Sequence, residues 1–263
     1  MQIQGLAYNN TQCLDLYLSG KPAQGIVICL HGGGFVSGGR DDERCRQASS
    51  LLREAGFNCA SVSYSLASPP DRFAMWPQNL FDVADAINFL HQHAGTYDYE
   101  FERFGLLGFS AGCCLANLYM QGGEKLFQQF GYAGRIFRPA ALVGFYGPYD
   151  FSIRQAERQS VDDDINRLHS PRHWLQTNEG NPPPPVLHIQ GDRDSIVWPD
   201  QHEAFQSDCE ERNYKFEGII ARGFEHSFAP RDTNSAGDSL DLGPDIVKFF
   251  SRHLATGDKD SKQ

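Results

Sequence analysis

Short apolar runs alternate with longer stretches of helical periodicity along most of this chain. The runs at 25–30, 140–145 and 186–189 are almost entirely apolar, which is typical of strands buried on both faces of a sheet. Further strands are expected at 14–18, 58–64, 104–107 and 214–220. Helices are expected at 41–55, 77–90, 111–120, 201–212 and 241–254. The alternation predicts an α/β fold with a mostly parallel central sheet and helices on both faces.

One segment interrupts this alternation of predicted strands and helices. Residues 149–185 are polar, include three consecutive aspartates at 162–164 and end in four prolines at 182–185. We therefore expect a small inserted surface segment, or a partial lid, that returns to the sheet through extended proline residues. The chain has no internal repeat and no interdomain linker, so residues 1–254 are predicted to form a single domain. The polar residues 255–263 are predicted to be a disordered tail.

Composition excludes several classes of function. The 263 residues include 23 Lys and Arg against 33 Asp and Glu, a formal net charge of −10, which argues against binding to nucleic acid or an anionic membrane. No apolar run is long enough to span a membrane, and the first residues lack the basic and apolar regions of a signal peptide. The seven cysteines are scattered without C-x-x-C spacing, so we expect reduced thiols in a cytoplasmic protein without a metal site.

The strongest chemical signal is the sequence Gly108-Phe-Ser-Ala-Gly112, which matches the G-x-S-x-G motif. It follows a predicted strand and precedes a predicted helix, which is the setting of a nucleophile elbow. Small residues around the serine allow the sharp turn that exposes its hydroxyl. Ser110 is therefore the candidate nucleophile, and the alternative is an ordinary serine in a glycine-rich turn.

Three consecutive glycines follow the apolar run at 25–30, in His31-Gly-Gly-Gly34. Such a loop brings backbone N–H groups close to a substrate, and this motif supplies oxyanion donors in lipases and esterases. We expect the donors to be the amides of Gly33, Gly34 and Ala111. His31 is interpreted as a brace of the loop, because the base follows the serine in this fold. A phosphate-binding glycine loop is the alternative, but no G-K-[ST] sequence follows it.

The catalytic acid and base are expected after the serine, in the order Asp or Glu and then His. Among the later histidines, only His226 lies in a loop directly after a predicted strand, so it is the candidate base. The candidate acid is Asp194, which follows another strand and would orient the imidazole. Asp192 is expected to brace the turn, and Asp200 to cap the next helix.

Four aromatic residues adjoin these motifs, and we expect them to line an apolar acyl pocket: Phe35, Phe109, Tyr146 and Phe228. The alternative is that they are core aromatics, since the chain contains 19 Phe. Adjacency in the sequence does not fix the direction of a side chain, so both interpretations stay open.

Together the motifs resemble the hormone-sensitive-lipase-like branch of the α/β-hydrolase superfamily and the short bacterial esterases that act on acetyl or feruloyl esters of plant polysaccharide. The matching pieces follow the same order along most of the chain, at 14–17, 31–35, 63–67, 108–112, 191–194 and 226–228. The resemblance implies an α/β-hydrolase fold and serine-dependent hydrolysis of small carboxylic esters without a cofactor. It also implies that Ser110, Asp194 and His226 form the triad.

Three features depart from that family. Ser65 stands where the family usually has Arg, which implies weaker support of the glycine loop. Cys113 stands where the family usually has Gly, which implies looser packing of the helix or a thiol near the site. Only 30 residues precede His31, so we expect an open acyl pocket that is covered at most by 149–185.

The reaction expected from these residues is acyl transfer through an acyl-enzyme, with a preference for short acyl groups. An arylformamidase or other amidase on the same triad and a non-catalytic receptor with a hydrolase fold are the alternatives. Gly34 favours esters, because the amidases that resemble this chain often carry a bulky aromatic residue there. The expected partner is a small-molecule ester, and a free strand edge would allow a homodimer.

Overall fold

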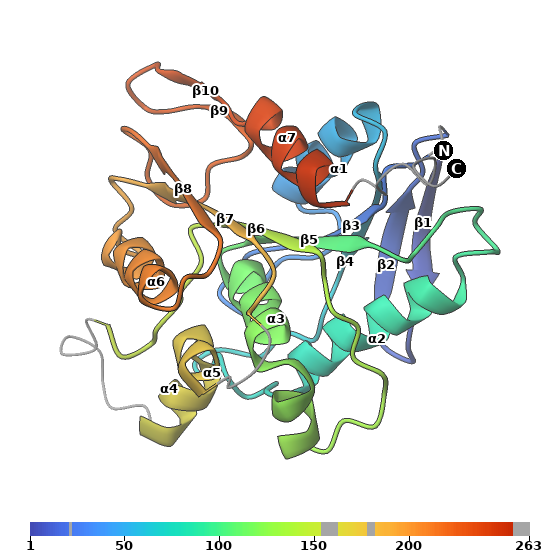
Figure 1. The fold of residues 1–263 in the computed structure, drawn as a ribbon, viewed down its shortest axis with the longest axis horizontal. Helices are drawn as coiled ribbons and strands as arrows, with labels where there is room; N and C mark the ends of the chain where they lie inside the picture. The colour runs from blue at the N-terminus through green and yellow to red at the C-terminus, as the bar shows by residue number, and fades with distance from the viewer. Residues whose placement is uncertain (21–22, 154–162, 178–181, 255–263) are drawn as a thin grey trace, which may run out of the picture.

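The computed structural model describes residues 1–20, 23–153, 163–177 and 182–254. An eight-stranded sheet in the order β1-β2-β4-β3-β5-β6-β7-β8 lies at its centre (Figure 1). The strands are β1 (Gln2–Ala7), β2 (Cys13–Tyr17), β3 (Ile26–Leu30), β4 (Asn58–Val62), β5 (Phe104–Phe109), β6 (Ala141–Phe145), β7 (Val186–Gly191) and β8 (Phe216–Ala221). β2 runs antiparallel to both of its neighbours, and β3 to β8 are mutually parallel.

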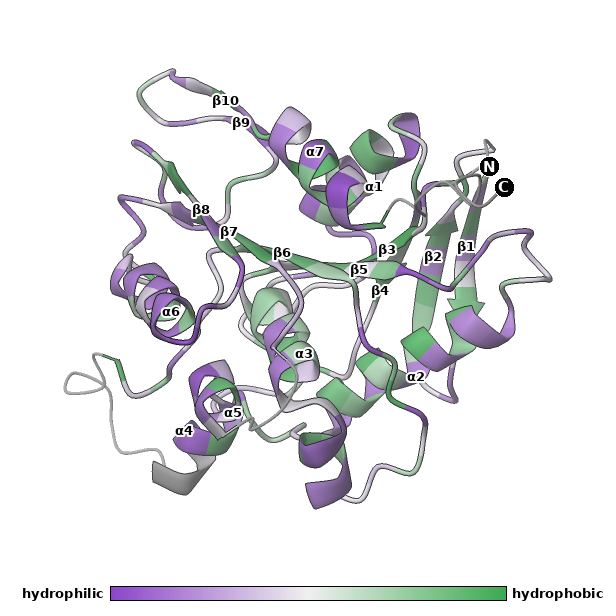
Figure 2. Ribbon diagram, viewed as in Figure 1, coloured by the Kyte–Doolittle hydropathy of each residue, from purple (hydrophilic) through white to green (hydrophobic). Residues whose placement is uncertain are grey.

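Helices cover both faces of this sheet (Figure 1). One face carries α1 (Glu43–Glu54) and α7 (Gly243–Leu254). The other carries α2 (Gln78–Gln92), α3 (Ala111–Gln129) and α6 (Asp200–Glu211). The central strands are hydrophobic along their length (Figure 2) because neighbouring residues such as Leu106 and Leu107 enter different cores on the two faces. The predicted α/β architecture, mostly parallel and covered on both faces, is confirmed.

Several elements lie where the hydrophobic pattern predicts none. They are β1, the hairpin of β9 (Arg231–Thr233) and β10 (Ser239–Asp241), and the helices α4 (Asp163–His169) and α5 (Pro171–Thr177). β1 is mostly exposed, with only Ile3 and Leu6 packed against the core, and it pairs through its backbone with β2. α3 extends beyond the predicted 111–120 because it continues across a non-helical residue, Gly123, with φ 47° and ψ −152°.

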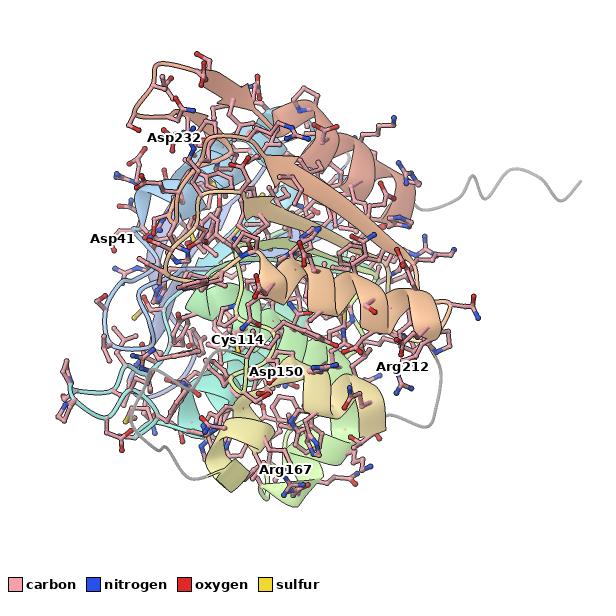
Figure 3. The ribbon with its side chains drawn as sticks, turned by 90° about the vertical axis from the view of Figure 1, so that its left-hand side faces the viewer. Asp41, Cys114, Asp150, Arg167, Arg212 and Asp232 are labelled. Atoms are coloured by element: carbon pink, nitrogen blue, oxygen red, sulfur yellow. The ribbon has the colours of Figure 1, made fainter. Side chains whose placement is uncertain are left out.

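Partly buried ionic contacts attach the described part of the predicted insertion to α6. Arg172 of α5 binds Asp208 of α6 at 2.8 Å and Asp150 at 3.0 Å, and Tyr149 donates to Asp208 at 3.0 Å. Asp150 lies between α6 and α5 (Figure 3). The segment is therefore anchored at its start and at α5, while its action as a lid stays a prediction. The predicted tail at 255–263 lies outside the described residues.

A pair of buried histidines links α6 to the sheet. Nδ1 of His188 on β7 lies 2.8 Å from Nδ1 of His202 on α6, so one ring donates and the other accepts. Burial lowers the pKa of His202 and lowers that of His188 well below its ordinary value, and the charge of His202 adds to the shift of His188. Both rings are therefore held neutral in the folded protein.

We expect the free energy of unfolding to fall as the pH drops below about 6.5, the ordinary pKa of histidine. In that range the unfolded histidines bind protons that the folded pair does not, so acid favours the unfolded state. Each such histidine contributes up to about 1.4 kcal/mol per pH unit. Urea unfolding between about pH 8 and about pH 5 measures the slope. His202→Gln should flatten it, whereas replacing the exposed His91 by Gln should not; equal slopes in both variants would contradict the assignment.

Candidate active site

Ser110 stands at a sharp turn between β5 and α3. Its backbone has φ 49° and ψ −115°, a conformation that residues with a side chain rarely adopt. A Cβ on Gly108 would lie 2.6 Å from Cα of Cys113, and a Cβ on Gly112 would lie 2.3 Å from the carbonyl oxygen of Leu30. Both glycines of the motif are therefore required by close backbone contacts, as a nucleophile elbow demands.

The three residues expected to form a triad lie within hydrogen-bonding distance of one another. Nε2 of His226 is 2.9 Å from Oγ of Ser110, and Nδ1 of His226 is 2.7 Å from Oδ2 of Asp194. Ser110 follows β5, Asp194 follows β7 and His226 follows β8. The C-terminal ends of these strands meet at one edge of the sheet. The carboxylate accepts from Nδ1–H, so Nε2 is left to accept the serine proton.

The carboxylate of Asp194 is fixed by several donors besides the imidazole. Oδ1 accepts from the amides of Ile196 and Val197, both at 2.9 Å. Oδ2 also accepts from Nε2 of Gln190 at 3.0 Å. Sequence reasoning missed Gln190, because nothing distinguishes it from any other polar residue at the end of a strand. These contacts set the carboxylate in one orientation toward His226.

The two other aspartates near this loop have different partners. Asp192 accepts from the amide of Gly223 at 2.6 Å and so ties the loop after β7 to the turn after β8. Asp200 is the first residue of α6. In this geometry the carboxylate that meets the imidazole belongs to Asp194.

The glycine loop lies directly against the nucleophile. A Cβ on Gly32 would be 3.3 Å from Cβ of Ser110. Gly33 has φ 112° and no room for a side chain, whereas Gly34, with φ 61°, faces open space. Within the described residues, the amides of Gly33, Gly34 and Ala111 donate to no other protein group. Ala111 is also the first residue of α3, where the helix dipole favours negative charge.

His31 braces the glycine loop. Its ring stacks on Tyr64 with centroids 4.1 Å apart, and its Nδ1–H donates to the carbonyl of Gly32 at 2.7 Å. The hydroxyl of Tyr64 donates to the carbonyl of His31 at 2.7 Å. Burial lowers the pKa of His31, which favours a neutral ring. The loop is thus supported although Ser65 replaces the family's usual Arg; the amide of Ser65 instead donates to the buried carboxylate of Asp82 at 2.7 Å.

Residues 14–208 match the model of the BD-FAE family. This chain belongs to the BD-FAE family. The matched range is most of the chain and includes Ser110 and Asp194, but it ends before His226. The position of the base therefore comes from the geometry and from the sequence order.

This BD-FAE protein is similar to two relatives in sequence and to two solved structures in fold. It is 36% identical to the acetyl esterase of Salmonella schwarzengrund over 140 residues, 53% of this chain and 41% of that protein. It is 28% identical to esterase LipC of Mycobacterium tuberculosis over 211 residues, 74% of this chain and 51% of that protein. The chain thus spans about half the length of these relatives.

The solved structures have low sequence identity and show the fold. A truncated carbohydrate esterase from gut microbiota has a TM-score of 0.76 at 19% identity, covering 97% of this chain and 96% of that chain. A thermophilic esterase from Thermogutta terrifontis has a TM-score of 0.76 at 16% identity, covering 98% and 95%. The α/β-hydrolase fold expected from the motifs is confirmed.

Cys113 fills space in this BD-FAE protein rather than loosening the elbow helix. Its Sγ lies 2.5 Å and 2.3 Å from where a Cβ would stand on Gly144 and Gly147. The expectation of looser packing is therefore wrong, because glycines on the neighbouring strand and loop make room for the sulfur. Burial raises the pKa of the Cys113 thiol to about 12, which keeps it protonated and unreactive.

The four aromatic residues expected to line an acyl pocket are all buried, at 5%, 0%, 0% and 4% exposure for Phe35, Phe109, Tyr146 and Phe228. Phe109, Tyr146 and Phe228 belong to the core beneath α1 and α7, and Phe35 belongs to the opposite core beside Phe73. In this structure they pack as core aromatics, which is the alternative weighed for them. The Tyr146 ring also touches the imidazole of His226, with centroids 4.7 Å apart.

The described residues contain no group of three His, Cys, Asp or Glu side chains arranged to hold a metal ion. In the same part of the chain, no helix has the length and apolar character needed to cross a membrane. All seven cysteines are free thiols, and six of them are buried.

Proposed function

We propose that this BD-FAE protein is a serine carboxylesterase that hydrolyses small esters with short acyl groups. The observation that carries the proposal is the continuous hydrogen-bonded path from Ser110 through His226 to Asp194, at 2.9 and 2.7 Å. Beside it lie three amides that donate to no other group in the part of the chain that the structure describes. The names of the relatives, an acetyl esterase and an esterase, support the same reaction.

In the first step, Oγ of Ser110 attacks the ester carbonyl while Nε2 of His226 takes its proton. The amides of Gly33, Gly34 and Ala111 stabilise the oxyanion of the tetrahedral intermediate. His226 then gives the proton to the departing alcohol, which leaves an acyl group on Ser110. Water, activated by the same imidazole, releases the acid and regenerates the enzyme.

The acyl group is proposed to be small, of the acetyl or feruloyl type. The aromatic side chains near the motifs are already buried in the two cores, so they offer little apolar surface to a long chain. Each methylene that stays in water forgoes about 0.8 kcal/mol of binding. Carbohydrate esters are plausible natural substrates, because solved structures with this fold include a carbohydrate esterase and an acetyl ester-xyloside bifunctional hydrolase.

A series of p-nitrophenyl esters of increasing acyl length tests this proposal. We expect kcat/KM to be highest for the acetate and to fall steadily toward the dodecanoate. A rise with chain length would contradict the small acyl site. N-formylkynurenine, assayed beside the series, separates amide from ester preference. Hydrolysis of neither class by the folded wild-type protein would favour a receptor.

A further inference from the structure

The side chain of Tyr146 is buried directly behind the candidate base. Its hydroxyl donates to the carbonyl of Phe228 at 2.7 Å. Its ring meets the imidazole of His226 edge-on, at 4.7 Å and 62°. The reaction steps above assign no task to Tyr146, although it contacts the catalytic loop at two points.

The backbone of Tyr146 is held in an unusual conformation. Its φ is 38°, which costs energy for a residue with a side chain. Its amide donates to the carbonyl of Ile189 on β7 at 2.7 Å. The chain thus leaves β6 in a fixed direction that brings the tyrosine ring under the imidazole.

A paired cation lies near the tyrosine hydroxyl. The pKa of Arg44 is raised mainly by its bond to Asp42 and further by the nearby Tyr146 hydroxyl. Nε and Nη2 of Arg44 hold the carboxylate of Asp42 at 2.9 and 2.6 Å. Nη2 is also 3.6 Å from where a Cβ would stand on Gly32. Arg44, in the first turn of α1, therefore lies close to the glycine loop.

The segment that carries the base needs such a support. Ser227, directly after His226, has φ 73°, so the chain turns sharply there. Asp194 holds the imidazole at Nδ1, and the Tyr146 hydroxyl holds the far end of the turn at Phe228. The loop thus has one anchor at the ring of His226 and a second two residues later, at the carbonyl of Phe228.

We propose that Tyr146, backed by the Arg44–Asp42 ion pair, is a positioning residue that holds the imidazole of His226 in reach of the Ser110 hydroxyl. The inference rests on the proposed function, since it gives the catalytic base a second support. Tyr146 has no step of its own in the proposed reaction and acts through the ring of His226, which it contacts.

The test compares Tyr146→Phe with Tyr119→Phe. Tyr119 is equally buried, and its hydroxyl donates to the carbonyl of Phe137 at 3.0 Å and accepts from the amide of Phe137 at 3.1 Å. The control variant therefore also loses a hydroxyl–carbonyl bond, together with a second bond. We expect Tyr146→Phe to lower kcat for p-nitrophenyl acetate by roughly tenfold to a hundredfold with KM unchanged, because displacing a catalytic group by a fraction of an ångström is costly. Tyr119→Phe should leave both constants unchanged. Equal activity losses in the two variants, or no loss in either, would overturn the proposal.

The rate of phosphorylation by paraoxon provides a readout that does not depend on ester turnover. Oγ of Ser110 forms the new bond to phosphorus, p-nitrophenolate leaves, and His226 takes the serine proton. The rate should fall in Tyr146→Phe by about the same factor as kcat. A wild-type protein that reacts with paraoxon but hydrolyses no ester would refute the proposed function alone. An unchanged paraoxon rate in Tyr146→Phe would refute the positioning role alone.

A double-mutant cycle tests whether Arg44 and Tyr146 act as one unit. If they do, Arg44→Met combined with Tyr146→Phe should lower kcat no further than the more harmful single substitution. Losses that multiply would show that the two side chains act independently, which would contradict the backing role of the ion pair.

Discussion

Replacing Ser110 by Ala is expected to lower kcat/KM for p-nitrophenyl acetate by about 10⁴-fold or more, a loss of the size seen when a triad nucleophile is removed. Without Oγ no acyl-enzyme can form, and His226 has no hydroxyl to activate. The folded protein should be unharmed, because alanine is smaller than serine and the elbow contacts are made by the glycines. Steady-state kinetics measure the loss, and mass spectrometry after paraoxon treatment should find one adduct on the wild type and none on the variant.

Ser49→Ala is the matched control for this result. Ser49 is also fully buried, but it lies on α1 and contacts Cys29 rather than the triad. Its replacement should leave kcat/KM within about threefold of the wild type, as expected for a site away from the reacting atoms. Ester hydrolysis that persisted in purified Ser110→Ala protein would show that another group is the nucleophile.

Asp194→Asn is expected to lower kcat by about 10⁴-fold with little change in fold, as for the buried acid of other serine triads. An amide at this position can still accept from the amides of Ile196 and Val197. It favours the wrong tautomer of His226, however, and it cannot stabilise the imidazolium that forms during the reaction. The kcat and KM of the purified variant, with unfolding monitored in parallel, measure the effect.

The neighbouring Asp192 offers a control two residues away. Asp192→Asn keeps an oxygen for the amide of Gly223, so it should retain activity within about threefold while costing up to about 1 kcal/mol of stability. The opposite outcome, with the larger loss in Asp192→Asn, would move the acid to that position and overturn the assignment of Asp194.

The central sheet was predictable because strands covered on both faces leave continuous apolar runs in the sequence. The meeting of the candidate triad residues was predictable because the strands before them are parallel. Parallel strands end at one edge of the sheet, so loops after β5, β7 and β8 meet there even though they are distant in the sequence. β1 was not predictable in this way, because only Ile3 and Leu6 pack against the core and the strand is held largely by backbone pairing with β2.

The supports around the candidate site could not be read from the sequence. Gln190 and Arg44 acquire their partners only when β7 and α1 join the rest of the fold, and no local motif marks them. Tyr146 was expected in an acyl pocket, and its contact with His226 was not foreseen. The expectation of an aromatic pocket shows a different limit of prediction from the sequence. Phe109 shares a strand face with Leu107, and the two-residue alternation of β5 places both in the core beneath α1 and α7. The fact that Phe109 directly precedes Ser110 in the sequence therefore gave no information about the direction of the Phe109 side chain.

The dispersion of the site over β5, β7 and β8 bears on the synthesis of the protein. A nascent chain that has passed α3 already contains the serine, but the imidazole that activates it is still to be translated. A product cut short before β8 would carry an inert hydroxyl in an elbow without its base. Truncation before His226 should thus eliminate catalysis even where most of the sheet can still assemble.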